Sequence, residues 1–105
     1  MLLNLALFDM AVQDAIEAPR VSTHHAPNSF YPHEAKPGHL RVEARLPYDV
    51  RRELQARGHQ LELRPDWSEG YVVAIVAEER HGILAGGADP RGEAATVIPA
   101  YAIGW

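Results

Sequence analysis

Residues 71–77 read Tyr-Val-Val-Ala-Ile-Val-Ala, and residues 83–88 read Ile-Leu-Ala-Gly-Gly-Ala. The first run is apolar and rich in β-branched residues, which favour a strand over a helix. A continuous apolar run is typical of a strand buried on both faces, so we expect this for residues 71–77. Residues 79–82, Glu-Arg-His-Gly, predict a turn. The two runs therefore predict a β-hairpin.

Two further strands are predicted upstream by alternating polarity. In residues 40–46 the apolar side chains face one side, and the charged ones, which include Glu43, face the other. Residues 59–64 alternate in the same way, so Leu61 and Leu63 are expected to point inward. Both segments are therefore expected to be half-buried strands.

A helix is predicted between these two strands. Pro47 is favoured in the first turn of a helix. Val50 and Leu54 are spaced to form its buried stripe. Gly58 suits the left-handed position that ends many helices, so the helix is expected to stop there.

The N-terminal segment predicts helix. Its apolar residues fall at helical spacing: Leu5, Phe8, Val12, Ala15 and Ile16. Asp9 is expected to cap a helix over residues 10–18, which Pro19 ends. A break near Phe8 and Asp9 would divide the segment into two short helices.

The next segment is predicted to be irregular after a short start. Residues 20–25 favour an extended piece. Residues 26–38 contain Pro27, Pro32 and Pro37, and each proline fixes its own φ. We expect residues 26–38 to form a stiff surface segment without regular structure.

These elements predict an α+β fold with a mostly antiparallel sheet and packed helices. Residues 1–105 are expected to form a single domain or a fragment of one. The apolar N-terminal helix and the two-faced strand need more cover than the short helices supply. The chain therefore has the pattern of a piece of a larger layered structure.

Composition excludes several classes of protein. The 105 residues carry a formal charge of −4 and no cysteine. An acidic balance argues against a nucleic-acid module, and the missing cysteine excludes disulfides and thiolate chemistry. The apolar start lacks a basic region and is interrupted by Asp9, and no run is long enough to span a bilayer. We expect a soluble chain with no export signal, cytoplasmic as given.

Few residues form a pattern that carries chemistry. His24, His25, His33 and Glu34 are the densest set of possible metal ligands, but their spacing is not H-E-x-x-H, and prolines prevent a shared helix. Local hydrogen bonding is the favoured interpretation for them.

The remaining reactive and small residues also favour structural roles. Ser22, Ser29 and Ser68 lie outside any nucleophile elbow. Gly86 and Gly87 lack the rest of a phosphate-binding loop, so close packing of the strand against another backbone is favoured. Three aromatic residues are expected to cover a core edge or a subunit boundary: Trp67, Tyr101 and Trp105.

Five stretches form a pattern in chain order. Residues 15–20 read Ala-Ile-Glu-Ala-Pro-Arg, and a His-His pair follows at 24–25. Residues 40–43 read Leu-Arg-Val-Glu, residues 54–59 Leu-Gln-Ala-Arg-Gly-His, and residues 86–92 Gly-Gly-Ala-Asp-Pro-Arg-Gly. In this order they resemble the C-terminal part of the small subunit in the γ-glutamyltransferase (γ-glutamyltranspeptidase) family.

The resemblance implies part of the αββα sandwich of an N-terminal-nucleophile hydrolase. In that family a threonine attacks the γ-glutamyl carbonyl, and a Ser-Ser-Gly-Gly loop supplies oxyanion donors. This chain has neither that loop nor Thr-Thr-His; its threonines are Thr23 and Thr96. No catalytic, substrate-binding or metal-ligating residue is therefore carried over, and no cofactor is implied. The positions that match family motifs are expected to be structural: Ala18, Pro19, Arg20, His24, His25, Asp89, Pro90 and Arg91.

Two functions remain open. In the first, the chain is the C-terminal structural portion of an enzyme that carries out γ-glutamyl transfer or hydrolysis on glutathione-type substrates. This portion is inactive alone, and its partner is the rest of the enzyme. The second is a free-standing, non-catalytic binding module derived from the same fold, which covers its apolar surfaces by forming a homo-oligomer. In both hypotheses the chain binds no nucleic acid and does not span a membrane.

Overall fold

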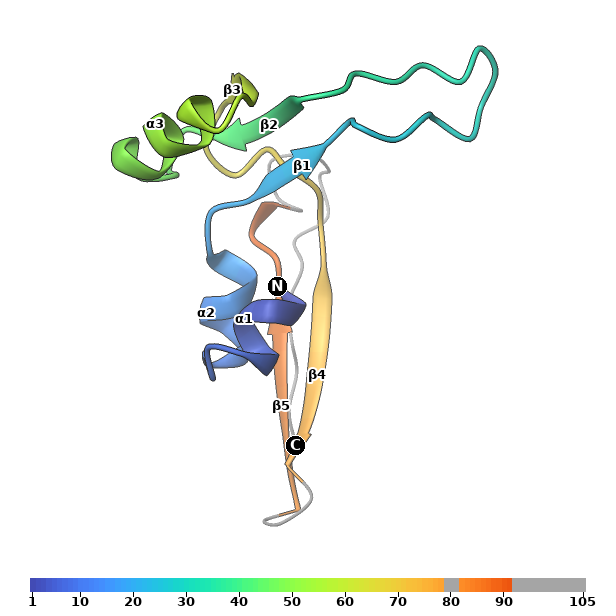
Figure 1. The fold of residues 1–105 in the computed structure, drawn as a ribbon. Coiled ribbons are helices and arrows are strands. Elements are labelled where there is room, and N and C mark those ends of the chain that lie inside the picture. Colours follow the sequence, from blue (N-terminus) through green and yellow to red (C-terminus); the bar gives the residue numbers. More distant parts are fainter. Residues whose placement is uncertain (79–81, 92–105) are drawn as a thin grey trace. The chain divides into compact units, whose positions relative to one another are not determined.

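The computed structural model describes residues 1–78 and 82–91 (Figure 1). The chain forms two compact units. Pro19–Glu69 form one, here called the sheet unit. Met1–Ala18 together with the chain from Gly70 onward form the other, here called the hairpin unit. Each unit is described by itself.

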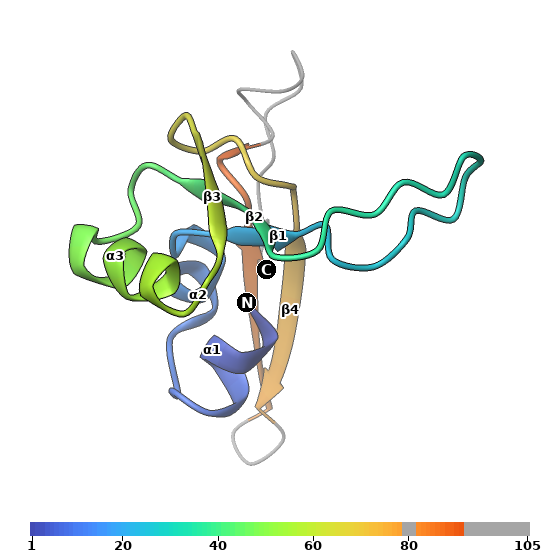
Figure 2. The ribbon, with the colours of Figure 1, turned by 45° about the horizontal axis from the view of Figure 1, so that its top comes forward.

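The sheet unit contains a three-stranded sheet and one helix. Its elements are β1 (Val21–Thr23), β2 (His39–Glu43), α3 (Tyr48–Ala56) and β3 (Gln60–Arg64). The strand order is β1-β2-β3, with β1 antiparallel and β3 parallel to β2. A parallel neighbour needs a crossover connection, which α3 supplies. Figure 2 shows α3 beside β3, and the two elements are in contact.

The boundaries of α3 agree with the sequence signals, with one shift. Pro47 is the residue that caps the helix, one position before its first turn. Gly58 has a φ of +93°, and its N–H donates to the Gln55 carbonyl at 2.9 Å. Such a left-handed φ favours glycine, which explains why the helix ends there.

Within its described residues, the hairpin unit contains the following helices and strands. They are α1 (Leu2–Ala6), α2 (Val12–Glu17), β4 (Val73–Glu78) and β5 (Ile83–Ala88). The strands pair antiparallel, as predicted, and α2 contacts both of them. Residues 79–81 of the predicted turn lie outside the described residues.

The predicted break in the N-terminal helix is confirmed, but the predicted cap is wrong. Asp9 lies between α1 and α2 with a φ of +49°, and Ala11 is the residue that precedes α2. The left-handed backbone at Asp9 turns the chain between the helices, so its carboxylate is not at the helix end. The last helical residue is Glu17, and Ala18 takes the extended conformation that a following proline favours.

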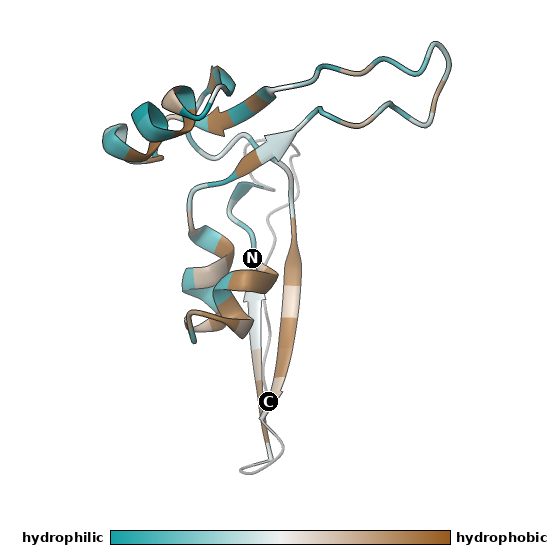
Figure 3. Ribbon diagram, in the orientation of Figure 1, coloured by the Kyte–Doolittle hydropathy of each residue, from teal (hydrophilic) through white to brown (hydrophobic). Residues whose placement is uncertain are grey.

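The expectation that the strand at 71–77 is buried on both faces is wrong for this chain. Val73 and Ile75 of β4 are 59% and 76% exposed, and Leu84 of β5 is 72% exposed. Gly87 of β5 points at α2, so α2 covers the opposite face of the hairpin from these three side chains. We call Val73, Ile75 and Leu84 the open face. The apolar colour of β4 is visible in Figure 3.

The buried side chains of the sheet unit also differ from those predicted. Val42 is fully buried, as its alternating pattern predicts. Leu63 is 57% exposed and Val50 39% exposed, so neither lies in a core. Glu43, predicted to face outward, is fully buried. The reason for its burial is a set of hydrogen bonds described below.

The fold class is confirmed as α+β, and among the described residues two of the three strand pairings are antiparallel. The parallel β2–β3 pair is the exception, and it follows from the strand-helix-strand order. Among the described residues, no helix has the length and hydrophobicity that crossing a membrane requires.

Candidate functional site

The Asp-Pro-Arg motif places a buried ion pair directly after β5. Asp89 is fully buried and Arg91 is 1% exposed. Arg91 Nη1 lies 3.1 Å from Asp89 Oδ1. The carboxylate also accepts hydrogen bonds from the backbone N–H of Val72 and of Arg91, both at 3.0 Å. Such multiple pairing is what permits a charged carboxylate to lie in a protein interior.

Arg91 also binds the end of α2. Its Nη1 donates to the Ile16 carbonyl and its Nη2 to the Ala18 carbonyl, each at 3.0 Å. The last carbonyls of a helix have no partner within the helix, and a cation there is favourable. Arg91 therefore joins the C-terminal end of α2 to the end of the hairpin. We call this arrangement of Asp89 and Arg91 the hairpin clamp.

Gln13 makes a second link between α2 and β5 that sequence reasoning missed. Its Nε2 donates to the Ala88 carbonyl at 3.0 Å, and its Oε1 accepts the Ala88 N–H at 3.1 Å. The amide side chain thus binds the strand end as a neighbouring strand would. A glutamine on a helix carries no local signal for such a contact, because its partner is distant in sequence.

Gly87 permits the close packing of α2 on the hairpin. A Cβ at this position would lie 2.6 Å from Ile16 Cδ1, far inside normal contact distance. Close packing at Gly87 agrees with the prediction, but the predicted neighbour is wrong. The atoms closest to Gly87 belong to side chains of α2 and not to another backbone.

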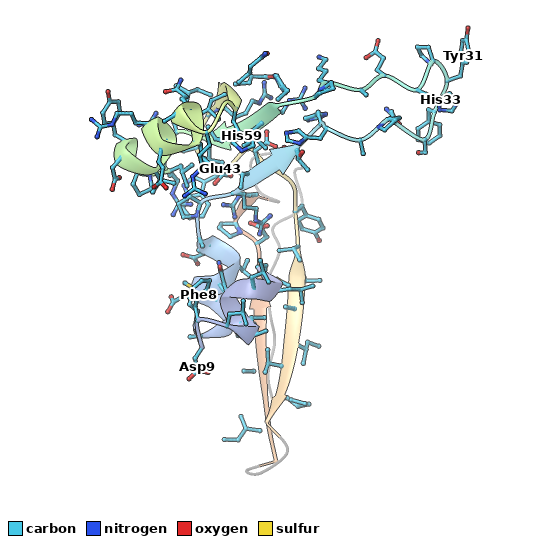
Figure 4. The ribbon with its side chains drawn as sticks, viewed as in Figure 1. Phe8, Asp9, Tyr31, His33, Glu43 and His59 are labelled. Atoms are coloured by element: carbon cyan, nitrogen blue, oxygen red, sulfur yellow. The ribbon has the colours of Figure 1, made fainter. Side chains whose placement is uncertain are left out.

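The sheet unit has its own buried carboxylate, at Glu43 (Figure 4). Glu43 Oε2 accepts the Arg20 N–H at 3.1 Å, and Oε1 accepts the Glu69 N–H at 3.2 Å. The backbone N–H of Glu43 donates to the Arg20 carbonyl at 3.1 Å. The side chain therefore joins β2 to the segments before β1 and after β3, and its hydrogen bonds compensate for its burial. This explains why the predicted outward position is wrong.

Glu69 extends this network. It is 9% exposed, and its Oε2 accepts a hydrogen bond from Ser22 Oγ at 2.5 Å. Its Oε1 lies 3.4 Å from Arg64 Nε, and its carbonyl accepts from Arg20 Nη1 at 3.3 Å. Ser22, one of the three candidate nucleophiles, is thus bonded to a carboxylate of the network.

Two of the other serine and aromatic candidates, Ser68 and Trp67, have local partners. Ser68 Oγ donates to the Pro65 carbonyl at 2.7 Å, and Ser29 is exposed. The guanidinium carbon of Arg45 lies 3.4 Å from the ring centroid of Trp67. Tyr101 and Trp105 lie outside the described residues.

Four histidines gather at the edge of the sheet where residues 26–38 leave it and return. The rings of His24 and His39 meet edge to face at 5.7 Å, and those of His25 and His59 stack at 5.7 Å. In the part of the chain that the structure describes, no three histidine or acidic side chains are placed to hold a metal ion. The structure therefore does not join His24 and His25 to His33 and Glu34.

Glu62 of β3 lies at the same edge, among cations. Its Oε2 lies 3.2 Å from His39 Nε2 and 3.3 Å from Arg41 Nε, and its Oε1 lies 3.3 Å from Arg64 Nη1. Desolvation raises the pKa of Glu62. The hydrogen bond from Arg41 and the charges of Arg41, Arg64 and His39 outweigh it, so the net effect lowers the pKa.

The motif residues thus fall into separate places. Ala18 lies in the hairpin unit with Asp89, Pro90 and Arg91, and its carbonyl binds Arg91. Pro19 and Arg20 lead into β1 in the sheet unit, and His24 and His25 follow that strand. Arg91 binds carbonyls at the end of α2 in the hairpin unit, and the backbone of Arg20 binds Glu43 in the sheet unit.

An α+β chain with an open apolar sheet face is typical of part of a layered protein. The family model described as Gamma-glutamyltranspeptidase matches residues 1–98. The chain belongs to the γ-glutamyltranspeptidase family. No curated protein sequence gives a significant match.

Solved structures agree with this family. LmbA2991HD is 38% identical with a TM-score of 0.86, and the match covers 99% of this chain and 18% of that one. Cephalosporin acylase from Bacillus halodurans is 27% identical with a TM-score of 0.69, and the match covers 86% of this chain and 15% of that one. An acivicin-inhibited γ-glutamyltranspeptidase is 26% identical with a TM-score of 0.61, with 88% and 44% covered.

These likenesses confirm the fold class implied by the resemblance, part of an N-terminal-nucleophile hydrolase of the γ-glutamyltranspeptidase type. The chain spans less than a fifth of the length of LmbA2991HD and of the cephalosporin acylase.

Proposed function

We propose that the chain is the C-terminal structural portion of the small subunit of a γ-glutamyltransferase-like enzyme. The enzyme catalyses γ-glutamyl transfer or hydrolysis on glutathione-type substrates. Its nucleophilic threonine and its oxyanion loop come from the remainder of the enzyme, because this sequence contains neither motif. The chain alone is catalytically silent, and that remainder is its partner.

The open face of the hairpin is the observation that carries this proposal. Val73, Ile75 and Leu84 are each more than half exposed on a two-stranded sheet, and α2 packs on part of its other face. An isolated two-stranded sheet is only marginally stable in water, and contiguous exposed apolar surface marks an interface. This chain spans only 18% of LmbA2991HD and 15% of the cephalosporin acylase, so the rest of the enzyme is the natural cover.

The hairpin clamp supports a structural role for this portion. Asp89 and Arg91 are almost completely buried, and among the described residues they bind backbone groups and each other. Such groups position a sheet rather than meet a substrate. The structure of the similar acivicin-inhibited enzyme is described as revealing critical roles for its C-terminus in autoprocessing and catalysis. We extend to this chain the idea that a C-terminal portion supports catalysis from a distance.

An activity assay on the purified chain tests the proposal. We expect no release of p-nitroaniline from γ-glutamyl-p-nitroanilide by the chain alone, and release once the threonine-bearing portion is supplied. Turnover by the pure chain that disappears in Ser22→Ala or Ser68→Ala would contradict the proposal and indicate a site of its own.

Light scattering separates the proposal from the free-standing module. A single discrete homo-oligomer with cooperative unfolding, in which the open face is protected, would favour the module. A monomer that binds the threonine-bearing portion favours the proposed function.

A further inference from the structure

Residues 24–38 form an arm that projects from the sheet unit between β1 and β2 (Figures 1 and 2). The arm contains no helix or strand, but backbone hydrogen bonds join its outgoing and returning segments. The Lys36 N–H donates to the His24 carbonyl at 2.8 Å, and the Asn28 N–H donates to the Glu34 carbonyl at 2.9 Å. The arm therefore has a defined path without a core beneath it.

The end of the arm is a turn with its own hydrogen bonds. The His33 N–H donates to the Phe30 carbonyl at 2.7 Å, and Asn28 Oδ1 accepts the Phe30 N–H at 3.1 Å. His33 Nδ1 lies 2.9 Å from the Asn28 carbonyl oxygen. The ring of Tyr31 meets that of His33 edge to face at 6.3 Å. Backbone and side chains thus hold the turn in one conformation.

This turn presents its aromatic side chains to solvent. Phe30 is 77% exposed and Tyr31 is 90% exposed, and Figure 4 shows Tyr31 and His33 at the far end of the arm. We call Phe30, Tyr31 and His33 the aromatic tip. Aromatic side chains on a pre-ordered loop are the composition of binding hot spots, because little conformational freedom is lost when they are buried. Pro27, Pro32 and Pro37 reduce that loss further.

We propose that the aromatic tip is a docking element that inserts into an apolar hollow on the remainder of the enzyme, outside this chain. This inference rests on the proposed function, because it takes its partner from it. More than four fifths of the chains of LmbA2991HD and the cephalosporin acylase lies outside the region that this chain matches. That length supplies the body into which the tip inserts.

A second copy of this chain is a poorer occupant. Contact of two tips would bury four large aromatic side chains, at about 150–250 Å² each, or about 1,000 Å² at most. A stable dimer buries about 1,200–2,000 Å². A tip that inserts into the body of its own enzyme only adds to the larger interface made by the open face, so its small area is sufficient there.

The test compares two variants of the chain in binding to the threonine-bearing portion. One is the double variant Phe30→Ser with Tyr31→Ser. The matched control is Tyr48→Ser, which removes a 71% exposed aromatic side chain from α3 in the same unit. Circular dichroism melts of the chain alone should be unchanged in both variants, since both sets of side chains are exposed.

Calorimetry of binding should then show at least roughly 30-fold weaker binding for the double variant, as for a hot spot, and less than about threefold for the control. Equal binding by the double variant and the unsubstituted chain would overturn this inference and leave the proposed function standing. Failure of the unsubstituted chain to bind would overturn the proposed function and the inference with it. A homodimer that the double variant dissolves would overturn the choice of partner.

Discussion

The hairpin clamp provides a quantitative test of how the hairpin unit is held together. Arg91→Ala would remove the ion pair to Asp89 at 3.1 Å and both hydrogen bonds to the carbonyls at the end of α2, at 3.0 Å. It would take the Arg91 guanidinium away from the fully buried Asp89 carboxylate. Breaking a buried pair in this way typically costs about 3–5 kcal/mol.

Hydrogen exchange is the assay, because it reports opening of one unit separately. A loss of 3 kcal/mol or more corresponds to at least roughly a 100-fold fall in protection of the backbone amides of β4 and β5. The matched control is Arg57→Ala. Arg57 has a side chain that is 68% exposed and pairs with Glu53 within α3. An exposed pair of this kind contributes only about 0.3–0.5 kcal/mol.

A second variant separates charge from packing. If the buried charge of Asp89 causes most of the loss in stability, adding Asp89→Asn to Arg91→Ala should recover part of the lost protection. The buried group at position 89 is then neutral. Two results would refute the reasoning: a fall of less than tenfold in Arg91→Ala, similar to that in Arg57→Ala, or no recovery in the double variant.

Three further predictions follow from other contacts. Gly87→Ala should lower the free energy of unfolding by about 1–3 kcal/mol, because its Cβ would lie 2.6 Å from Ile16 Cδ1. The control Gly86→Ala, at an exposed position, should change it by less than about 0.5 kcal/mol. Thermal melts measure both variants, and equal effects would contradict close packing at Gly87. Glu43→Ala should lower the free energy of unfolding in urea by about 1–3 kcal/mol, because two backbone N–H groups lose their acceptor. The control is Glu53→Ala, since the side chain of Glu53 is 63% exposed. A loss in Glu43→Ala no larger than that in the control would argue against this role of Glu43. Because the pKa of Glu62 is lowered in the fold, its stabilisation is present above the ordinary carboxyl pKa of 4.5 and is lost as the pH falls through the lower, folded-state pKa. Glu62→Gln should therefore be less stable than the unsubstituted chain at pH 7, and the difference should shrink as the pH is lowered below 4.5. A difference in the free energy of unfolding that stays constant, or grows, as the pH is lowered would refute this.

Local signals predicted most elements of the fold. Residues 83–88 form β5 with the predicted boundaries, and Pro19 and Gly58 end helices as expected. These signals are local because a proline or a left-handed glycine acts on its own backbone. Asp9 shows the limit, since its side chain suits a helix cap but its backbone is needed for the turn between α1 and α2.

Burial was harder to predict because it depends on partners that are distant in sequence. Alternation placed Glu43 on the charged face of its strand, but the N–H groups of Arg20 and Glu69 reach it from segments 23 and 26 residues away. The apolar run at 71–77 predicts cover on two sides, and this chain covers one. The exposure of the other face is explained if another part of the enzyme packs on it.

The candidate site was predicted in part. The Asp-Pro-Arg motif pointed to Asp89 and Arg91, which the structure brings together, but the sequence carried no signal that Arg91 binds the end of α2 or that Gln13 binds Ala88. Both contacts cross 75 residues of sequence, so only the folded chain reveals them.

We propose that the nucleophile of the enzyme lies outside this chain, and the DNA sequence that precedes the Met1 codon is the measurement that tests this. We expect an open reading frame, continuous with this one or in an adjacent gene, that encodes Thr-Thr-His and then Ser-Ser-Gly-Gly. A promoter and ribosome-binding site directly before Met1, with no such frame beside them, would contradict the claim and favour the self-associating module.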